Sequence, residues 1–284
     1  MSTAAVVETP SGKDETTENF PVGSWLLPAE LRPHIAKFYR FARAIDDIAD
    51  NPELVAKTKV DRLEAMDAAV CGGETYGQRG YETASVLHDS LKETGITTRH
   101  CSDLVDAFKQ DALKNRYDDW DDLISYCMRS AAPVGRYLLD LHGEDRSGYP
   151  YSDALCNALQ VINHMQDCKD DFLEMDRVYL PDVWLKQHDT GVAALREDRA
   201  SWQLRAVIDK CLDGSAELMK TANLLPRRLK NRRLAMESAV IVNIANKLIA
   251  ELRTRDPLAE RVKLSKGQLA RCTFSGILGG LIGH

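Results

Sequence analysis

One stretch near the N-terminus, from Phe38 to Asp50, constrains the fold of this chain more than any other. If it is helical, its apolar residues and those just before it form one stripe: Leu31, Ile35, Phe38, Ala42, Ile45 and Ala49. A second, polar stripe runs one position further along: Tyr39, Arg43, Asp46 and Asp50. Successive residues in a helix are about 100° apart, so both aspartates should lie at the edge of the buried face. Two carboxylates there are costly unless a cation lies near them.

Helical spacing continues through the rest of the chain. The segments that show it are 52–70, 80–94, 100–115, 119–142, 152–175, 182–224, 229–254 and 264–282. Pro28 suits the start of the first long helix, and Asn51-Pro52 should end it. Pro133 should kink or break the segment that contains it. No alternation of β-branched residues or hairpin turn is visible, so the sequence predicts an all-α fold of about ten helices.

Composition limits the partners and the compartment that suit such a fold. The 284 residues carry a net charge of −6 and show no basic face, which argues against nucleic acid as a partner. The seven cysteines are scattered without a CxxC pair, as in a reducing compartment, and no apolar run is long enough to span a bilayer. Residues 1–18 are polar and aperiodic, so we expect a disordered tail before a single domain at residues 19–284 of a cytoplasmic protein.

A second acidic stretch repeats the arrangement of the first. Its polar stripe consists of Gln160, Asn163, Asp167 and Asp171, beside the apolar Leu155, Leu159 and Ile162. One Asp-x-x-x-Asp pair alone is more often a solvated helix face. Two such pairs, each beside an apolar stripe, favour four carboxylates directed toward one cavity. Mg²⁺ prefers oxygen ligands and is usually held by a few carboxylates and substrate phosphates, so bridging ions would neutralise a diphosphate there. Asp111, late in a charged helix, is weaker evidence.

Four motifs follow one another along the chain. They are Tyr39-x-x-x-Arg43-x-x-Asp46-Asp47-x-x-Asp50, Tyr126-Cys127 before Val134-Gly135, Leu159-Gln160-x-Ile162-Asn163-x-x-x-Asp167-x-x-x-Asp171, and Arg177-Val178-Tyr179-Leu180-Pro181. In this order they resemble the squalene and phytoene synthases, over about residues 19–270. The resemblance implies an isoprenoid synthase helical bundle with a central apolar cavity that takes isoprenoid diphosphates.

Within that family, two segments are most similar to the bacterial hydroxysqualene synthases of the hopanoid route: residues 18–22 and residues 126–136. This similarity implies that presqualene diphosphate exchanges its diphosphate for a hydroxyl group from water, without a nicotinamide cofactor. A sister presqualene diphosphate synthase and a squalene-forming reductase are the implied partners. Two alternatives remain open: condensation of two prenyl diphosphates to presqualene diphosphate, squalene or phytoene, and an inactive partner of a sister synthase.

The resemblance also implies roles for individual residues. The metal ligands would be Asp46, Asp50, Asn163, Asp167 and Asp171, for up to three Mg²⁺ ions bridged by diphosphate. The catalytic residues would be the four aspartates of that set with Tyr39 and Arg43. The substrate-binding residues would be Asn19, Phe20, Phe38, Asp111, Tyr126, Ser130, Ala131, Gly135, Gln160, Asn163, Arg177, Tyr179 and Arg261. The aromatic residues are alternatively plain core, the small residues close helix packing, and Arg261 an ion-pair partner of the aspartates.

The chain departs from the family pattern at several positions. Gln166 stands where a basic residue usually precedes the aspartate, and Asn19-Phe20 stands where a Ser-Phe pair is usual. Both changes are compatible with metal binding and count against a two-substrate condensation. His164, two positions from the polar stripe, is expected to be structural. The Gly-rich segment 274–283 is too short to span a bilayer, and it either touches a membrane surface, packs on the bundle or frays.

Overall fold

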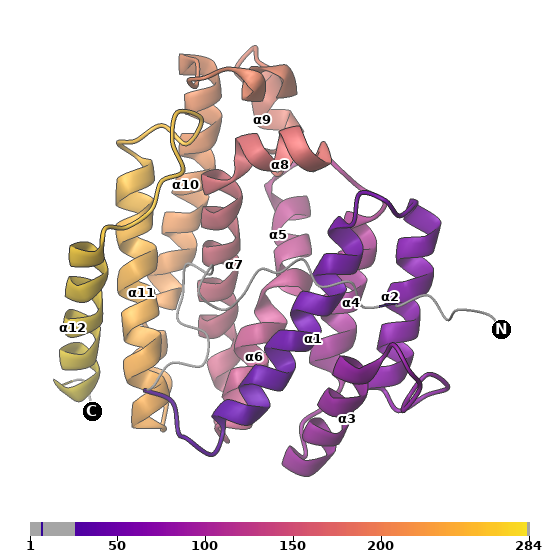
Figure 1. The fold of residues 1–284 in the computed structure, drawn as a ribbon. Coiled ribbons are helices and arrows are strands. Elements are labelled where there is room, and N and C mark those ends of the chain that lie inside the picture. Colours follow the sequence, from indigo (N-terminus) through magenta and orange to yellow (C-terminus); the bar gives the residue numbers. More distant parts are fainter. Residues whose placement is uncertain (1–6, 8–25, 283–284) are drawn as a thin grey trace. The chain divides into compact units, whose positions relative to one another are not determined.

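The computed structural model describes residue 7 and residues 26–282, and this part of the chain forms helices and no strands (Figure 1). The α-helices are α1 (Arg32–Asp50), α2 (Ala56–Val70), α3 (Glu82–Thr94), α4 (Arg99–Asp111), α5 (Trp120–Ser130), α6 (Ala132–Leu141), α7 (Tyr149–Gln166), α8 (Cys168–Met175), α9 (Asp182–Gln187), α10 (Trp202–Ala222), α11 (Arg232–Leu252) and α12 (Lys266–Ile282). Three 3₁₀ helices are η1 (Arg146–Gly148), η2 (Val192–Arg196) and η3 (Leu225–Arg228). The predicted all-α fold is confirmed.

Helix α1 buries four of the six residues of the predicted apolar stripe, while Leu31 and Ala42 are only partly buried. Its buried residues are Ile35, Phe38, Phe41, Ile45, Ile48 and Ala49. The predicted start at Pro28 is wrong, because the amide of Leu31 donates to the carbonyl of Pro28 at 3.1 Å and closes a turn before the helix. Pro33 occupies the first helical turn instead. The predicted end is confirmed: Asn51, which precedes a proline, is extended, with φ −62° and ψ 114°.

The helical pattern is interrupted at two places where the sequence predicts residues that bind substrate or metal. Helices α5 and α6 separate at Ala131, two residues before Pro133, which confirms the predicted break. The continuous helix predicted over residues 152–175 is wrong, because the chain leaves helical geometry at Asp167, with φ −109° and ψ 9°, between α7 and α8. Periodicity did not show this break, because backbone hydrogen bonds four residues apart continue across it and the spacing of the side chains is hardly changed.

Contacts between residues divide the chain into two compact units. The first unit contains residues 1–114 and 140–143, and the second contains residues 115–139 and 144–284. In the first unit, α1 packs against α2, α3 and α4. In the second unit, α7 packs against α5, α10 and α11, and α12 lies along α11 (Figure 1). The single domain expected at residues 19–284 and its central apolar cavity stay predictions.

The two ends of the chain are described only in part. The disordered tail predicted at residues 1–18 lies outside the described residues, apart from Val7. Near the other end, α12 approaches α11 closely at Gly276, where a Cβ atom would lie 2.6 Å from the Cα atom of Val240. A side chain at this position would collide with backbone, which is why glycine occupies it. Among the described residues, no helix is both long enough and apolar enough to cross a membrane.

Candidate active site

Two of the predicted metal ligands, Asp46 and Asp50, lie in the last turns of α1. The side chain of Asp46 is 26% exposed. The Nη1 atom of Arg43 lies 2.7 Å from Oδ2 of Asp46, and its Nη2 atom lies 3.5 Å from Oδ1 of Asp47. The cation that the sequence predicted beside these carboxylates is therefore supplied in part by the same helix. Lys59 of α2 donates to the carbonyl of Ala49 at 2.7 Å and adds positive charge at the helix end.

The carboxyl group of Asp46 has a pKa well above its ordinary range. Burial is the largest cause, the charge of Asp50 is the next, and Arg43 opposes both. Asp111 adds to the increase in the pKa, so it lies within electrostatic range of Asp46. Asp111 is the last residue of α4 and is buried. A divalent cation at this position would attract the carboxylates more strongly than they repel one another, because its charge is larger than that of either carboxylate.

The other predicted ligands lie where α7 meets α8 in the second unit. Asn163 is on α7, Asp167 is at the break, and Asp171 is on α8. Backbone hydrogen bonds span the break: the amide of Asp167 donates to the carbonyl of Asn163 at 3.0 Å, and the amide of Asp171 donates to the carbonyl of Asp167 at 2.8 Å. Asp167 and Asp171 consequently remain one turn apart although the helix is interrupted.

Arg261 forms a two-point ion pair with Asp167. Its Nε atom lies 2.6 Å from Oδ1, and its Nη2 atom lies 2.7 Å from Oδ2. The sequence left a diphosphate contact and an ion pair open for Arg261, and the structure contains the ion pair. Burial nevertheless raises the pKa of Asp167 above its ordinary range, and Arg261 lowers it only partly back. Like Asp46, this carboxylate lies where additional positive charge is favourable.

Aromatic rings gather beside this junction in the second unit. Tyr126 and Tyr179 are buried, with ring centroids 5.7 Å apart. Tyr117, which the sequence did not single out, lies 5.4 Å from each of them. It is brought there by backbone pairing, since the amide of Val178 donates to the carbonyl of Asn115 at 2.9 Å. The faces of these buried rings carry negative partial charge, which attracts cations.

The ring of His164 packs against this aromatic cluster. Its ring stacks on Tyr179, with centroids 3.4 Å apart and an interplanar angle of 12°. Burial and, to a lesser extent, the charge of the buried Arg177 together lower the pKa of His164 to about 3. The imidazole is therefore neutral at physiological pH. Its stacking fits the structural role expected from the sequence.

The small residues around the break between α5 and α6 are buried. Gly135 faces α7: a Cβ atom there would lie 2.7 Å from Sγ of Cys156, and closer still to Oγ of Ser152. Close helix packing, one of the two alternatives, therefore explains this glycine. A place in the wall of a substrate tunnel stays a prediction for Ser130 and Ala131.

The remaining predicted residues are scattered over the described part and beyond it. Phe38 is buried in the core of the first unit, while Tyr39 and Gln160 are partly exposed. Asn19 and Phe20 lie outside the described residues. Gln166 was noted only as a departure from a pattern, yet it is buried and bonded to the carbonyl of Val262. Its place on the apolar stripe, four residues after Ile162, was the available signal.

The donor atoms at both aspartate pairs fit Mg²⁺. All are carboxylate oxygens, joined at Asn163 by an amide oxygen, and hard cations prefer such ligands. Within residues 26–279, no group of three or more His, Cys, Asp or Glu side chains is arranged to hold a metal ion. Mg²⁺ commonly takes one or two carboxylates and completes its shell with water and substrate phosphates, so a pair of aspartates is sufficient.

Comparison with known proteins agrees with these motifs. The model of the family described as squalene/phytoene synthase matches residues 14–268. A hydroxysqualene synthase of Rhodopseudomonas palustris is 40% identical over 94% of this chain and 90% of its own length, and one of Zymomonas mobilis is 39% identical over 99% and 93%. The crystal structure of squalene synthase HpnC from Alicyclobacillus acidocaldarius is 30% identical, with a TM-score of 0.71 over 82% of this chain and 86% of that one. The chain therefore belongs to the squalene/phytoene synthase family.

Proposed function

We propose that this protein is a hydroxysqualene synthase, which converts presqualene diphosphate and water to hydroxysqualene and diphosphate. The observation that carries the proposal is the 39–40% identity, over nearly the whole chain, to relatives that bear this name. The acidic motifs support an active enzyme over an inactive partner protein, because both aspartate pairs are intact.

The proposed metal ligands are the residues assigned from the motifs: Asp46, Asp50, Asn163, Asp167 and Asp171. Bound Mg²⁺ would neutralise the diphosphate and stabilise it as a leaving group. The raised pKa values of Asp46 and Asp167 support this assignment, since each carboxylate lacks enough positive charge around it in the metal-free protein.

The remaining residues act on the leaving group and on the cation that forms. Arg43 and Arg261 already contact an aspartate of the proposed site, so they are placed to supply positive charge to the diphosphate. Breaking the C–O bond to diphosphate leaves a cyclopropylcarbinyl cation, which the buried faces of Tyr126 and Tyr179 would stabilise. The cyclopropane ring of this cation then rearranges and opens by breaking a ring C–C bond. Attack by water on the resulting cationic carbon forms the new C–O bond, and the surplus proton leaves to diphosphate or solvent.

The function is tested with purified protein, presqualene diphosphate and Mg²⁺, without NADPH, followed by identification of the lipid product. Hydroxysqualene is the expected product. Turnover of farnesyl diphosphate alone would instead assign the protein to the condensing synthases. No turnover of either substrate would favour the inactive partner of a sister synthase.

The same chemistry implies the neighbouring steps. A sister synthase that joins two farnesyl diphosphates would supply presqualene diphosphate, and a reductase that removes the hydroxyl group would form squalene. Both substrate and product carry long hydrocarbon chains that favour a membrane. If the protein lay at a membrane surface, these molecules would travel a shorter distance between the membrane and the active site.

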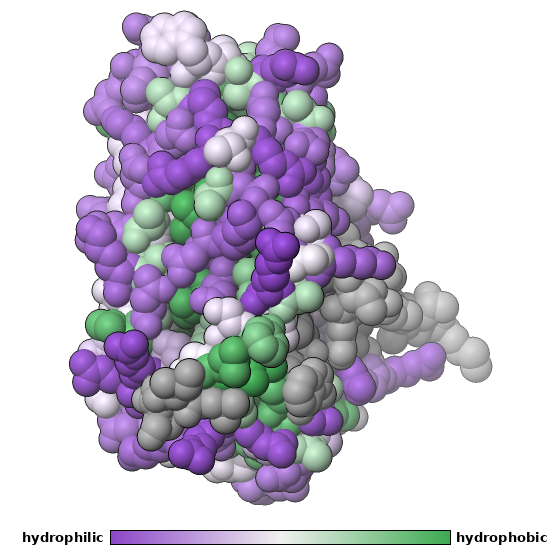
Figure 2. Space-filling view, turned by 90° about the vertical axis from the view of Figure 1, so that its left-hand side faces the viewer, coloured by the Kyte–Doolittle hydropathy of each residue, from purple (hydrophilic) through white to green (hydrophobic). Residues whose placement is uncertain are grey.

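Helix α12 has the side chains for contact with an anionic membrane surface. Phe274 and Leu278 are 68% and 42% exposed on this helix. Figure 2 views the side on which α12 lies, and apolar side chains gather there within a mainly polar surface. Residues 261–284 contain no aspartate or glutamate, although the whole chain carries a net charge of −6, and Lys263, Lys266 and Arg271 are exposed. Basic and apolar side chains together favour binding to anionic lipid.

A variant with Phe274→Ser and Leu278→Ser is expected to bind anionic vesicles at least about tenfold more weakly than the unaltered protein, because it loses the apolar contact. Co-sedimentation with phosphatidylserine vesicles measures this, and added salt should weaken binding by the unaltered protein. The matched control carries Val86→Ser and Leu224→Ser, which remove exposed apolar side chains elsewhere. Equal binding by both variants would contradict the membrane contact.

A further inference from the structure

Gln166, the last residue of α7, is joined to a segment 96 residues later in the chain. Its Nε2 atom donates a hydrogen bond to the backbone carbonyl of Val262. Gln166 is 2% exposed and Val262 is 0% exposed, so neither group has ready access to solvent as a replacement partner. A buried amide that loses its partner is costly, and this contact should therefore be kept in the folded protein.

The neighbouring residues form a second contact beside the first. Asp167 follows Gln166 and holds Arg261, which precedes Val262, through the ion pair at 2.6 and 2.7 Å. Two consecutive residues at the end of α7 thus bind two consecutive residues of the later segment. Because the hydrogen bond fixes the backbone at Val262, it also fixes the point from which the side chain of Arg261 reaches Asp167.

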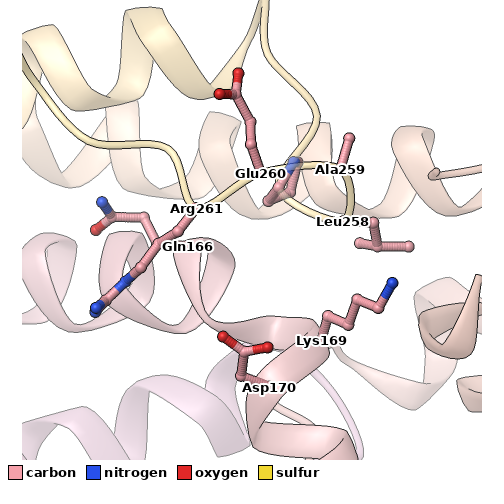
Figure 3. Close-up of a pocket in the computed structure, with 8 residues that line it drawn as sticks. Gln166, Lys169, Asp170, Leu258, Ala259, Glu260 and Arg261 are labelled. Atoms are coloured by element: carbon pink, nitrogen blue, oxygen red, sulfur yellow. The ribbon is translucent and has the colours of Figure 1, made fainter. Parts of the chain in front are cut away.

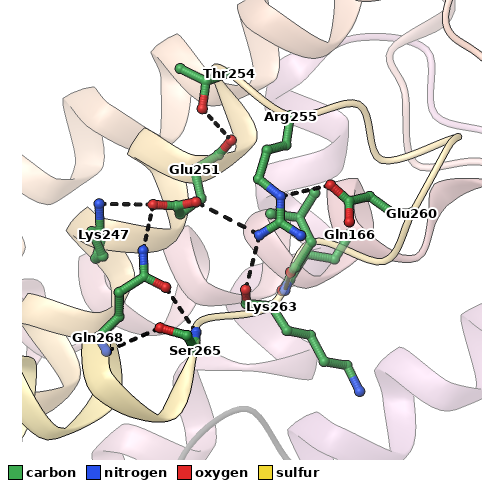
Figure 4. Close-up of polar contacts among 10 residues, drawn as sticks. Gln166, Lys247, Glu251, Thr254, Arg255, Glu260, Lys263, Ser265 and Gln268 are labelled. Carbon is green, nitrogen blue, oxygen red and sulfur yellow. Dashed lines mark hydrogen bonds and ion pairs between the residues drawn. The ribbon is translucent and has the colours of Figure 1, made fainter.

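The segment between α11 and α12, residues 253–265, is braced internally (Figure 4). Arg255 pairs with Glu260 at 2.8 Å and donates to the carbonyl of Lys263 at 3.0 Å. Gln268 donates to Glu251 at 2.7 Å and accepts from the amide of Ser265 at 2.8 Å. This bracing favours one shape of the segment, so the contacts that join it to the end of α7 help to set where Arg261 lies.

A gap separates part of the segment from the start of α8, although Pro257 and Leu258 of the segment are buried. A hollow of about 250 Å³ lies between Lys169 and Asp170 on one side and residues 257–261 on the other (Figure 3). Gln166 lines the same hollow. Since no side chain fills this space, the hydrogen bond of Gln166 and the ion pair of Asp167 carry more of the attachment than they would across a packed interface.

We propose that Gln166 is a positioning residue for the diphosphate site: through Val262 it holds Arg261 beside Asp167. The inference rests on the proposed function, in which Asp167 binds metal and Arg261 supplies charge to the diphosphate. Gln166 provides the hydrogen-bond donor, and the positive charge beside Asp167 comes from Arg261 on the segment that this donor holds.

The test measures binding of inorganic pyrophosphate with Mg²⁺ by calorimetry. Gln166→Met keeps the size of the side chain and removes the donor, and it is expected to weaken pyrophosphate binding about tenfold. Gln187→Met is the matched control, because Gln187 is exposed and its amide oxygen accepts a hydrogen bond from Lys210 of α10 at 2.9 Å. This control should bind pyrophosphate like the unaltered protein.

A double-mutant cycle separates positioning from a merely structural effect. If Gln166 acts through Arg261, the combined variant Gln166→Met, Arg261→Gln should bind pyrophosphate no more weakly than Arg261→Gln alone. Losses that multiply to about a hundredfold would overturn the proposal. Gln166→Asn, which keeps an amide too short to reach Val262, repeats the cycle if the methionine variant does not fold.

Amide hydrogen exchange of residues 257–265 in the metal-free protein distinguishes failure of this inference from failure of the proposed function. Exchange is expected to rise severalfold in Gln166→Met and to stay unchanged in Gln187→Met. If the unaltered protein binds no pyrophosphate, the proposed function fails while exchange still decides whether Gln166 holds the segment. Unchanged exchange in Gln166→Met would overturn the positioning role whatever the pyrophosphate result.

Discussion

An Asp46→Asn variant is expected to lose at least about a thousandfold in the rate of diphosphate release, and yet to unfold at a higher temperature than the unaltered protein when no metal is present. The loss of rate follows because asparagine removes a negatively charged ligand from the proposed magnesium site. Diphosphate release from presqualene diphosphate with Mg²⁺ measures the rate, and circular dichroism follows helicity and unfolding.

The gain in stability follows from the raised pKa of Asp46. An acid whose pKa is higher in the folded state binds its proton more tightly there, so the fold loses stability as pH rises from the unfolded pKa, about 4, through the folded pKa. Asparagine carries no charge to bury beside Asp50. The stability advantage of the variant should therefore be absent below about pH 4 and grow as pH rises to neutrality, reaching on the order of 1 kcal/mol.

Asp61→Asn is the matched control for this prediction. Asp61 lies on α2 with its side chain 57% exposed and pairs with Lys57 at 2.8 Å, so its loss should change neither rate nor unfolding temperature appreciably. Full activity in Asp46→Asn would contradict the metal assignment. Lower stability of that variant at pH 7 would contradict the inference that the charge of Asp46 is unfavourable beside Asp50 in the metal-free protein.

A Gly135→Ala variant is expected to be less stable than the unaltered protein by about 1–3 kcal/mol. In an ordinary helix the same change stabilises by up to about 1 kcal/mol, because alanine has the higher helix propensity. Here the new Cβ atom would lie 2.7 Å from Sγ of Cys156 on the facing helix, and closer still to Oγ of Ser152, so these side chains or the helix that carries them would have to shift. Thermal unfolding measures the change, and a drop of several degrees is expected.

Gly267→Ala is the control, and its expected effect on stability is zero or of opposite sign. Gly267 lies in the first turn of α12, and a Cβ atom there would meet nothing within 4 Å. This variant should be as stable as the unaltered protein or slightly more stable. If Gly135→Ala behaved in the same way, close packing of α6 on α7 would not explain the glycine, and the alternative of space for a substrate would gain support.

Much of the fold could be predicted from the spacing of side chains. The stripe through Ile35, Phe38 and Ile45 placed the buried face of α1 correctly, and Asn51-Pro52 marked its end. The break before Pro133 was equally readable. These features depend on local geometry, in which the identity of a residue and its near neighbours set the backbone conformation. The start of α1 was misplaced because Pro28 and Pro33 both suit a first turn, and sequence alone does not choose between them.

The candidate site was predictable only in outline. Both aspartate pairs were visible in the sequence, because carboxylates one helical turn apart form a local pattern. The proximity of Asp111 to Asp46 was not visible, since it depends on how α4 packs against α1. The interruption at Asp167 also escaped notice, because a break of one residue scarcely disturbs the periodicity on either side.

The sequence by itself determined that this chain is helical, that its helices have one buried face, and that two acidic pairs lie beside such faces. Arg43 meets Asp46 within one helix, but only the tertiary structure decided which cation meets the second pair. Arg261 reaches Asp167 from 94 residues away, and Gln166 bonds to Val262 from 96 residues away. Contacts over such separations depend on the path of the intervening α8 to α11, and helical periodicity carries no information about that path because it describes only neighbours within a few turns.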